Sequence, residues 1–127
     1  MIAVDSSALM AIVLDEGQAS ACAEALARSD PLIMSALTYA EVMIVAQGRG
    51  CGEVIRQLIE ALAIEIMPVD ETTAEQAAYA YQVWGKGRHR ASLNPGDCFS
   101  YVLAKTHDCP LLYIGNDFSQ TDIKSAL

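Results

Sequence analysis

Short apolar runs alternate with longer helical stretches along the chain, and this alternation constrains the fold more than any other feature. Such runs lack a polar face, so they predict strands that are buried on both sides. Buried strands separated by helices are typical of a parallel sheet covered on both faces. The expected strands are Ile2–Val4, Leu32–Met34, Ile64–Val69 and Pro110–Ile114.

The segments between these runs carry helix signals. Ser35 can cap the helix that follows it, and Thr72 and Glu75 have the spacing of a capping box. Pro95 stands at a first helical position, directly after Asn94. The expected helices are residues 6–14, 18–28, 36–47, 53–63, 72–84 and 95–107, with a basic loop over 85–93.

Length and charge limit the possible functions. The 127 residues predict one domain spanning 1–127, because a second full core would not fit. The chain has 8 basic and 16 acidic residues, which gives a net charge of −8. Charge alone therefore does not attract nucleic acid, and a nucleic-acid role requires metal ions, a local basic patch or a basic partner.

The sequence has no signal of secretion, membrane insertion or zinc binding. No apolar run reaches the roughly 18 residues of a bilayer span, and no basic start precedes Asp5. We therefore expect a cytoplasmic protein with reduced, buried thiols. No zinc-ligand spacing joins the cysteines and histidines, which are Cys22, Cys51, Cys98, Cys109, His89 and His107.

Four acidic residues fall where a parallel sheet binds ligands, beyond the carboxyl ends of its strands. Asp5 directly follows the first strand, and Asp117 lies three residues after the last. Glu41 and Asp97 belong to the helices next to the second and fourth strands. Each acid also has a structural interpretation as a helix cap or a turn residue. Their joint position is what predicts a site.

A cluster of carboxylates predicts a bound cation. Two like charges about 4 Å apart repel by about 4 kcal/mol at an effective dielectric constant of about 20, so the cluster must protonate or bind a cation. Oxygen ligands without His or Cys suit Mg²⁺ or Mn²⁺. Such an ion can activate a water molecule and stabilise charge on a phosphate.

A basic segment stands just before Asp97. Lys86, Arg88 and Arg90 are three of the 8 basic residues, and His89 lies among them. These side chains can bind phosphates beside a metal site. They can equally form a solvated loop with no ligand, and the sequence leaves both interpretations open.

Over its whole length, the chain resembles the PIN-domain ribonucleases, specifically the VapC-like toxins of bacterial type II toxin–antitoxin pairs. The resemblance rests on the motifs VDSSALMAI, SALTYAEV, GKGRHRASLNPGDCFSYVLAK and LLYIGNDFSQTDI. It implies a three-layer α/β/α sandwich with a central parallel sheet of four to five strands. It also implies a metal-dependent endoribonuclease that uses Mg²⁺ or Mn²⁺.

The resemblance assigns roles to individual residues. The family's four acids fall on Asp5, Glu41, Asp97 and Asp117, which implies an active enzyme. Asp5 and Asp97 are expected to hold the metal, directly or through water. Glu41 and Asp117 are expected to complete the acidic pocket and to orient or deprotonate the attacking water.

Further residues are implied to support the site. Ser6 and Thr38 would lie beside the acids and orient ligands or water. Asn116 stands where many relatives carry another acid. Asp122, in the last motif, is expected to be mainly structural.

The resemblance implies three partners: an RNA substrate, a small cognate antitoxin, and a second toxin copy in a homodimer or a larger toxin–antitoxin assembly. A net charge of −8 suits a basic antitoxin. The helical stretches 36–47 and 53–63 are candidates for the dimer interface, although core packing explains most of their apolar residues as well.

Two other functions compete with a nuclease. A phospho-acceptor receiver domain needs paired acids after the first strand and a Lys after the last. Here Asp5 stands alone, residues 115–117 contain no Lys, and Asp70 is the only acceptor candidate. A non-catalytic PIN-like module that only binds a partner would be favoured by the loss of one of the four acids, and none is lost.

Overall fold

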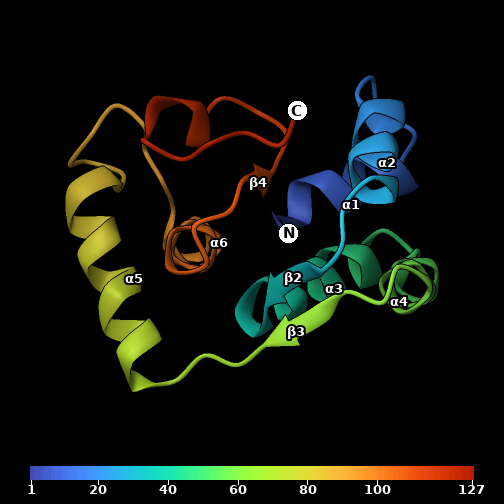
Figure 1. Ribbon diagram of the computed structural model, residues 1–127, viewed down its shortest axis with the longest axis horizontal. Helices are drawn as coiled ribbons and strands as arrows, with labels where there is room; N and C mark the ends of the chain where they lie inside the picture. The colour runs from blue at the N-terminus through green and yellow to red at the C-terminus, as the bar shows by residue number, and fades with distance from the viewer.

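Four short parallel strands form the sheet that the apolar runs predict. The computed structural model describes residues 1–127, and its strand order is β3-β2-β1-β4, with every neighbouring pair parallel (Figure 1). In the register of the sheet, Ala3 of β1 pairs with Ile33 on one side and with Leu111 on the other. The strands are β1 (Ile2–Val4), β2 (Leu32–Ser35), β3 (Glu65–Met67) and β4 (Leu111–Leu112).

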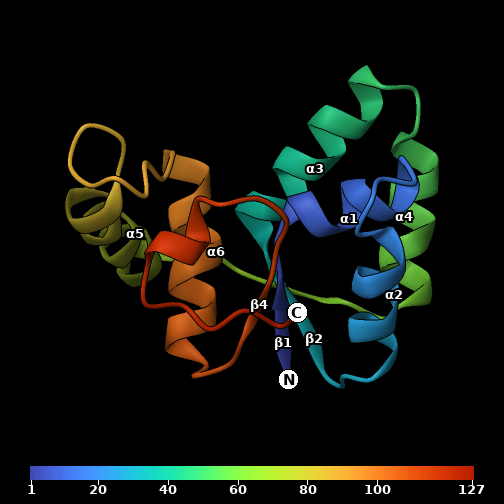
Figure 2. The same cartoon turned by 90° about the horizontal axis from the view of Figure 1, so that it is seen from above.

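Helices cover both faces of the sheet. They are α1 (Ser6–Val13), α2 (Ala19–Ala27), α3 (Ala36–Gly48), α4 (Gly52–Ala61), α5 (Glu71–Trp84) and α6 (Pro95–Thr106), and a short 3₁₀ helix, η1, spans Phe118–Gln120. Figure 2 shows α1 to α4 on one side of the strands and α5 and α6 on the other. The expected three-layer α/β/α sandwich is therefore confirmed, with four strands in the sheet.

Alternate strand residues feed two separate cores. Ile2 and Val4 pack with the helices α1 to α4, whereas Ala3 packs with α5 and α6. All three residues of β1 are buried, as expected for a strand covered on both faces. The edge strand β3 departs from this expectation, because Glu65 is exposed and Ile66 is only half-buried.

The structure corrects one predicted helix start. Thr72 does not cap α5. The helix begins at Glu71, and the Asp70 side chain accepts hydrogen bonds from the Thr73 amide and hydroxyl, each at 2.9 Å. Asp70 competes successfully because it lies three residues before that amide, which is the spacing an N-cap requires.

Several other predictions from the sequence agree with the structure. Ser35 caps α3, and Asn94 caps α6 with Pro95 in its first turn. All four cysteines are free thiols, of which Cys51 alone is not fully buried. None of the helices combines the length and the apolar character that crossing a bilayer requires.

The corrected cap can be tested by unfolding. We expect Asp70→Ala to lower the urea midpoint, since the amide and hydroxyl of Thr73 lose their acceptor. Thr72→Ala should leave the midpoint unchanged within error. The measurement is circular dichroism in urea at pH 7. A larger loss for Thr72→Ala would restore the capping box that we reject.

Candidate active site

The chain reverses its direction of winding between β1 and β4. From β1 it moves outward to β2 and β3, and it then crosses to β4 on the other side of β1. Such a switch point opens a crevice at the carboxyl ends of the two strands. Asp5 follows β1, and Asp117 follows β4. Residues of α3 and α6 reach the same edge of the sheet.

Asp5 is the buried centre of this edge, with only 6% of its surface exposed. Its Oδ2 accepts hydrogen bonds from the Ser7 amide at 3.2 Å and from the Ser7 hydroxyl at 2.7 Å. Its Oδ1 accepts from the Ser100 hydroxyl at 2.7 Å. Asp5 therefore caps α1, as its structural interpretation predicts, and also presents a fixed carboxylate at the switch point.

Ser100 links Asp5 to α3. Its hydroxyl has one proton, which goes to Asp5, so the Thr38 hydroxyl must donate to Ser100 Oγ across 3.0 Å. Thr38 and Ser100 are both buried. This relay, which we call the Thr38–Ser100–Asp5 chain, connects α3, α6 and the end of β1.

The sequence reasoning missed Ser100 and Ser7. Ser100 lies three residues after Asp97 on α6, so helical periodicity places the two on one face and could have indicated it. The expected neighbour, Ser6, makes no side-chain hydrogen bond, and Ser7 bonds to Asp5 instead. The Ser7 hydroxyl also accepts from the Ile114 amide at 3.0 Å, which joins the end of β4 to α1.

Glu41 lies against the first turn of α6. Its carboxylate is so close to Gly96 that a Cβ at that position would force the Glu41 side chain to move. The positive end of the α6 dipole also faces this carboxylate. Burial raises the pKa of Glu41, and the charge of Asp5 raises it further.

Asp97 belongs both to the cap of α6 and to the group of acids. It completes a capping box: its amide donates to Asn94 Oδ1 at 2.8 Å, and its Oδ2 accepts from the Asn94 amide at 3.0 Å. Burial raises the pKa of Asp97 to about 6, against the lowering effect of the Asn94 amide. The charges of Asp5, Asp117 and Glu41 add to the rise, so all four acids act on one another.

Asp117 comes from the turn between β4 and η1. It is exposed, and so is Asn116, whose carbonyl accepts from the Ser119 hydroxyl at 2.6 Å. The next residue, Phe118, is buried against Tyr113 with ring centroids 5.1 Å apart. This contact fixes the turn and holds Asp117 at the edge of the sheet.

No three of the acidic side chains lie close enough together to hold a metal ion between them. Asp5 and Asp97 are held by hydrogen bonds to their own helices, and uncompensated charges repel. Their donor set still suits a hard cation, because every candidate ligand is a carboxylate oxygen and no Cys or His side chain is among them. The charges of the other three acids contribute to the raised pKa of Asp97, and a bound cation would offset this repulsion.

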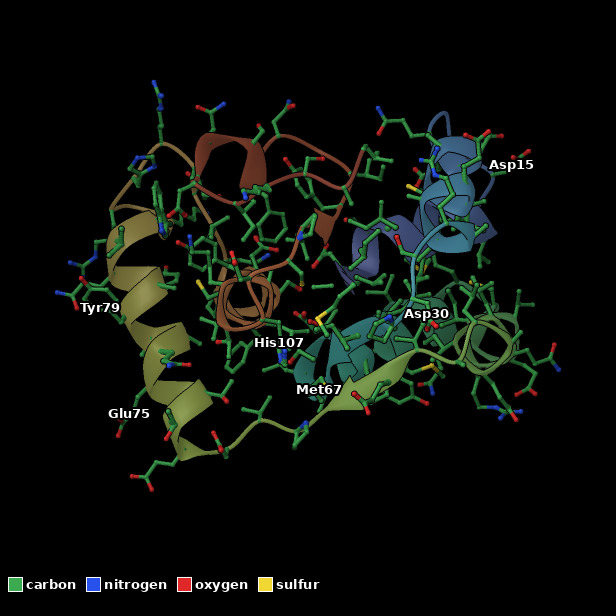
Figure 3. The ribbon with its side chains drawn as sticks, viewed as in Figure 1. Asp15, Asp30, Met67, Glu75, Tyr79 and His107 are labelled. Atoms are coloured by element: carbon green, nitrogen blue, oxygen red, sulfur yellow. The ribbon has the colours of Figure 1, made fainter.

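Other candidate residues lie outside the group of four acids. The Lys86, Arg88 and Arg90 side chains are exposed in the loop before α6. His107 caps the opposite end of α6 (Figure 3). Asp122 is structural as expected, since it accepts from the Tyr101 hydroxyl at 2.6 Å and from Lys105 at 3.0 Å.

A cavity of about 690 Å³ beside α5 and α6 does not contain the four acids, and Tyr79, Trp84 and Tyr101 are among its lining residues. The receiver-domain acceptor, Asp70, follows the edge strand β3, two strands away from β1. Neither feature adds a reactive group to the site at the switch point.

Comparisons of sequence agree on one family. The family profile of the PIN domain matches residues 2–124. Ribonuclease VapC36 of Mycobacterium tuberculosis is 47% identical over 126 residues, which cover 95% of this chain and 90% of that protein. Ribonuclease VapC30 of the same species is 40% identical over 123 residues and 94% of each chain.

Solved structures share the fold. VapC20 of Mycobacterium tuberculosis, described as a sarcin–ricin loop cleaving toxin, matches with a TM-score of 0.75 and 16% identity, over 97% of this chain and 96% of that one. A toxin–antitoxin complex from Klebsiella pneumoniae contains a chain that matches with a TM-score of 0.73 and 20% identity, over 96% and 93% of the two chains. At these identities, the likeness is one of architecture.

The pKa of Asp97 predicts how metal-free stability depends on pH. Because the folded pKa is raised, the folded state binds more protons than the unfolded state between about pH 4 and about pH 6, so the free energy of unfolding falls as pH rises through this window. Asp97→Asn removes this fall and should stabilise the metal-free protein at pH 7 by about 1 to 2 kcal/mol. Solvent screening at a partly open site reduces the roughly 3 kcal/mol that the pKa rise alone implies.

The measurement is urea unfolding in EDTA at pH 4, 5, 6 and 7. Glu24→Gln, an exposed change of the same charge on α2, is the control and should follow the wild-type curve. If the free energy of unfolding depends on pH in the same way for wild type and Asp97→Asn, the pKa of Asp97 is not raised in the folded state.

Proposed function

The chain belongs to the PIN-domain family, and from this premise we propose that it is an endoribonuclease of the VapC type, the toxin of a toxin–antitoxin pair. Relatives named ribonuclease VapC, which are 40–47% identical over nearly the whole chain, support the proposal. The observation that carries it is electrostatic: the charges of Asp5, Asp117 and Glu41 all raise the pKa of Asp97 at the switch point of the sheet.

Asp5 and Asp97 are the residues that would hold a Mg²⁺ or Mn²⁺ ion, directly or through water. When bound, the ion supplies positive charge for the phosphate and lowers the pKa of a bound water. Asp5 is fitted to this role because Ser7 and Ser100 fix both of its oxygens and leave one lone pair of Oδ1 free. Glu41 and Asp117 would complete the shell around the ion through water.

Glu41 is the best-placed proton acceptor for the attacking water. Its raised pKa makes it a stronger base than an ordinary carboxylate. The packing of Gly96 against its carboxylate fixes the position from which it can take the proton. Thr38, one turn earlier on α3, orients Ser100 and through it Asp5.

The partners follow from charge and exposed apolar surface. Ile44 and Val45 on α3 and Val54 on α4 are 69%, 49% and 52% exposed. Such side chains suit an antitoxin or a second toxin copy in a homodimer. The net charge of −8 favours a basic antitoxin. An RNA substrate and four free thiols fit the predicted cytoplasmic location.

The two rival functions lose support. Membership of the PIN-domain family leaves no basis for a receiver domain, and Asp70 serves as a helix cap. A module that only binds a partner would be favoured by the loss of one of the four acids, and all four are present.

The nuclease is tested by RNA cleavage with the purified chain, freed of any partner. We expect cleavage of a pool of structured RNA in Mg²⁺ or Mn²⁺, none in EDTA, and none by Asp97→Asn, because that variant loses a charged ligand while Asn94 still caps the helix. Glu24→Gln, prepared in the same way, controls for contaminating ribonuclease. Equal cleavage by wild type and by folded Asp97→Asn would rule out this active site, and its absence from both would favour the binding module.

The Thr38–Ser100–Asp5 chain makes a second prediction. Ser100→Ala removes the donor to Asp5 Oδ1, so Asp5 is no longer held in one orientation. We expect the Mn²⁺ affinity and kcat to fall by about 10- to 100-fold, with KM for RNA nearly unchanged. Electron paramagnetic resonance titration with Mn²⁺ and steady-state cleavage measure the two effects.

Ser119→Ala is the matched control, since the Ser119 hydroxyl is exposed and bonds only to a backbone carbonyl. It should leave both quantities unchanged. An Mn²⁺ affinity of Ser100→Ala equal to that of wild type would mean that Ser100 supports only the packing of α6.

A further inference from the structure

The segment Gly85–Leu93, which we call the basic loop, is closed at its base. The Lys86 amide donates to the Leu93 carbonyl at 3.0 Å, and the Leu93 amide donates to the Trp84 carbonyl at 3.1 Å. Gly85 and Leu93 thus form an isolated parallel bridge. Leu93 itself is fully buried in the core, so the loop is anchored where it meets α6.

The interior of the basic loop is also fixed. The amides of Arg88 and His89 both donate to the Gly85 carbonyl, at 2.9 and 3.0 Å. His89 Nδ1 accepts from the Ala91 amide at 3.0 Å, and its ring lies edge-on to Trp84 with centroids 4.8 Å apart. The loop therefore has its shape before any ligand arrives, which lowers the entropy cost of binding.

The cations of the basic loop have no partner within the chain. The ion pairs in the structure involve Arg56 and Lys105, and none involves Lys86, Arg88 or Arg90. All three are exposed. Three unpaired cations on one short loop, in a chain of net charge −8, form a local site for an anion.

The position of the basic loop relative to the acids indicates which anion. The loop leads directly into the first turn of α6, which carries Asp97. Figure 2 shows it beside that end of α6, on the side away from α3 and α1. A strand of RNA with one phosphate at the acids can therefore continue over the loop, where the charge is of opposite sign.

We propose that the basic loop is a preformed phosphate clamp that binds the RNA backbone beside the scissile bond, with Arg88 and Arg90 as its principal contacts. This inference rests on the proposed function, because it takes RNA to be the substrate. The clamp binds RNA equally in the ground state and in the transition state, so it lowers KM and leaves kcat alone. Phosphate contacts carry no sequence information, so it acts on any RNA strand.

The test compares two double variants of equal charge change. Arg88→Glu with Arg90→Glu alters the clamp. Arg28→Glu with Lys124→Glu alters exposed cations at the other end of the sheet, near the start of β2 and beside β4. Both doubles are made in an Asp97→Asn background, so that RNA stays intact during the measurement. The probe is a fluorescein-labelled 20-nucleotide single-stranded RNA of random sequence, titrated at several salt concentrations.

We expect the clamp double to bind this RNA at least tenfold more weakly than its Asp97→Asn parent, and the control double to bind within about threefold of it. The slope of log K against log salt should fall by about 0.7 for each phosphate that the protein no longer neutralises, so by about 1.4 for the clamp double. With Asp97 intact, the same clamp changes should raise KM and leave kcat within about twofold. Circular dichroism establishes that each variant is folded.

Equal losses of affinity in the two doubles would mean that total charge alone weakens binding, and would overturn the proposal. Wild-type affinity in the clamp double would also overturn it and would leave an acidic protein segment as the partner of the loop. Clamp-dependent binding without cleavage by wild type would contradict the proposed nuclease and not the clamp. Cleavage with the same KM in wild type and in the clamp double would contradict the clamp and not the proposed nuclease.

Discussion

The rest of the structure depends on one buried carboxylate, that of Asp5. Burying a charge is expensive unless hydrogen bonds replace its water, and three donors from Ser7 and Ser100 do so here. Those donors belong to α1 and α6, which lie on opposite faces of the sheet. Holding Asp5 thus fixes how both helix layers meet the end of β1. No buried side-chain nitrogen or oxygen in the chain lacks a partner.

The same constraint explains why structural and catalytic roles coincide at this edge. The start of a helix needs capping side chains, and Asp5 and Asp97 belong to the caps of α1 and α6. Caps bring carboxylates to the positive ends of helices, where their charge is tolerated. Burial is the main cause of the raised pKa of Asp97, and the charges of the other three acids add to it. In the proposed function, the carboxylates of Asp5 and Asp97 would serve both in caps and as metal ligands.

These facts also separate what the sequence could predict from what it could not. Apolar runs and strand ends can be recognised from neighbouring residues in the sequence. The sheet, the two helix layers and the position of Asp5 after β1 could therefore be predicted. Ser100 and Asp5 are 95 positions apart, and only the packing of α6 on the sheet brings them within 2.7 Å. The Asp70 cap was missed for the opposite reason, because two acceptors at neighbouring positions offered the same local signal. The membership of the four acids in one site and their roles toward a metal both stay predictions.

Opposite charges on the two sides of the start of α6 explain how an acidic protein could bind a polyanion. The helix begins with Asp97 facing the acids, and the basic loop precedes it by only a few residues. If the basic loop is the proposed clamp, RNA is repelled at the crevice and attracted beside it, so it is oriented before its backbone reaches the carboxylates. A cation at the acids removes the repulsion at the one place where chemistry is needed. On this view, metal binding completes the electrostatic surface for RNA as well as the catalytic site, and a site without metal should hold RNA by the loop alone.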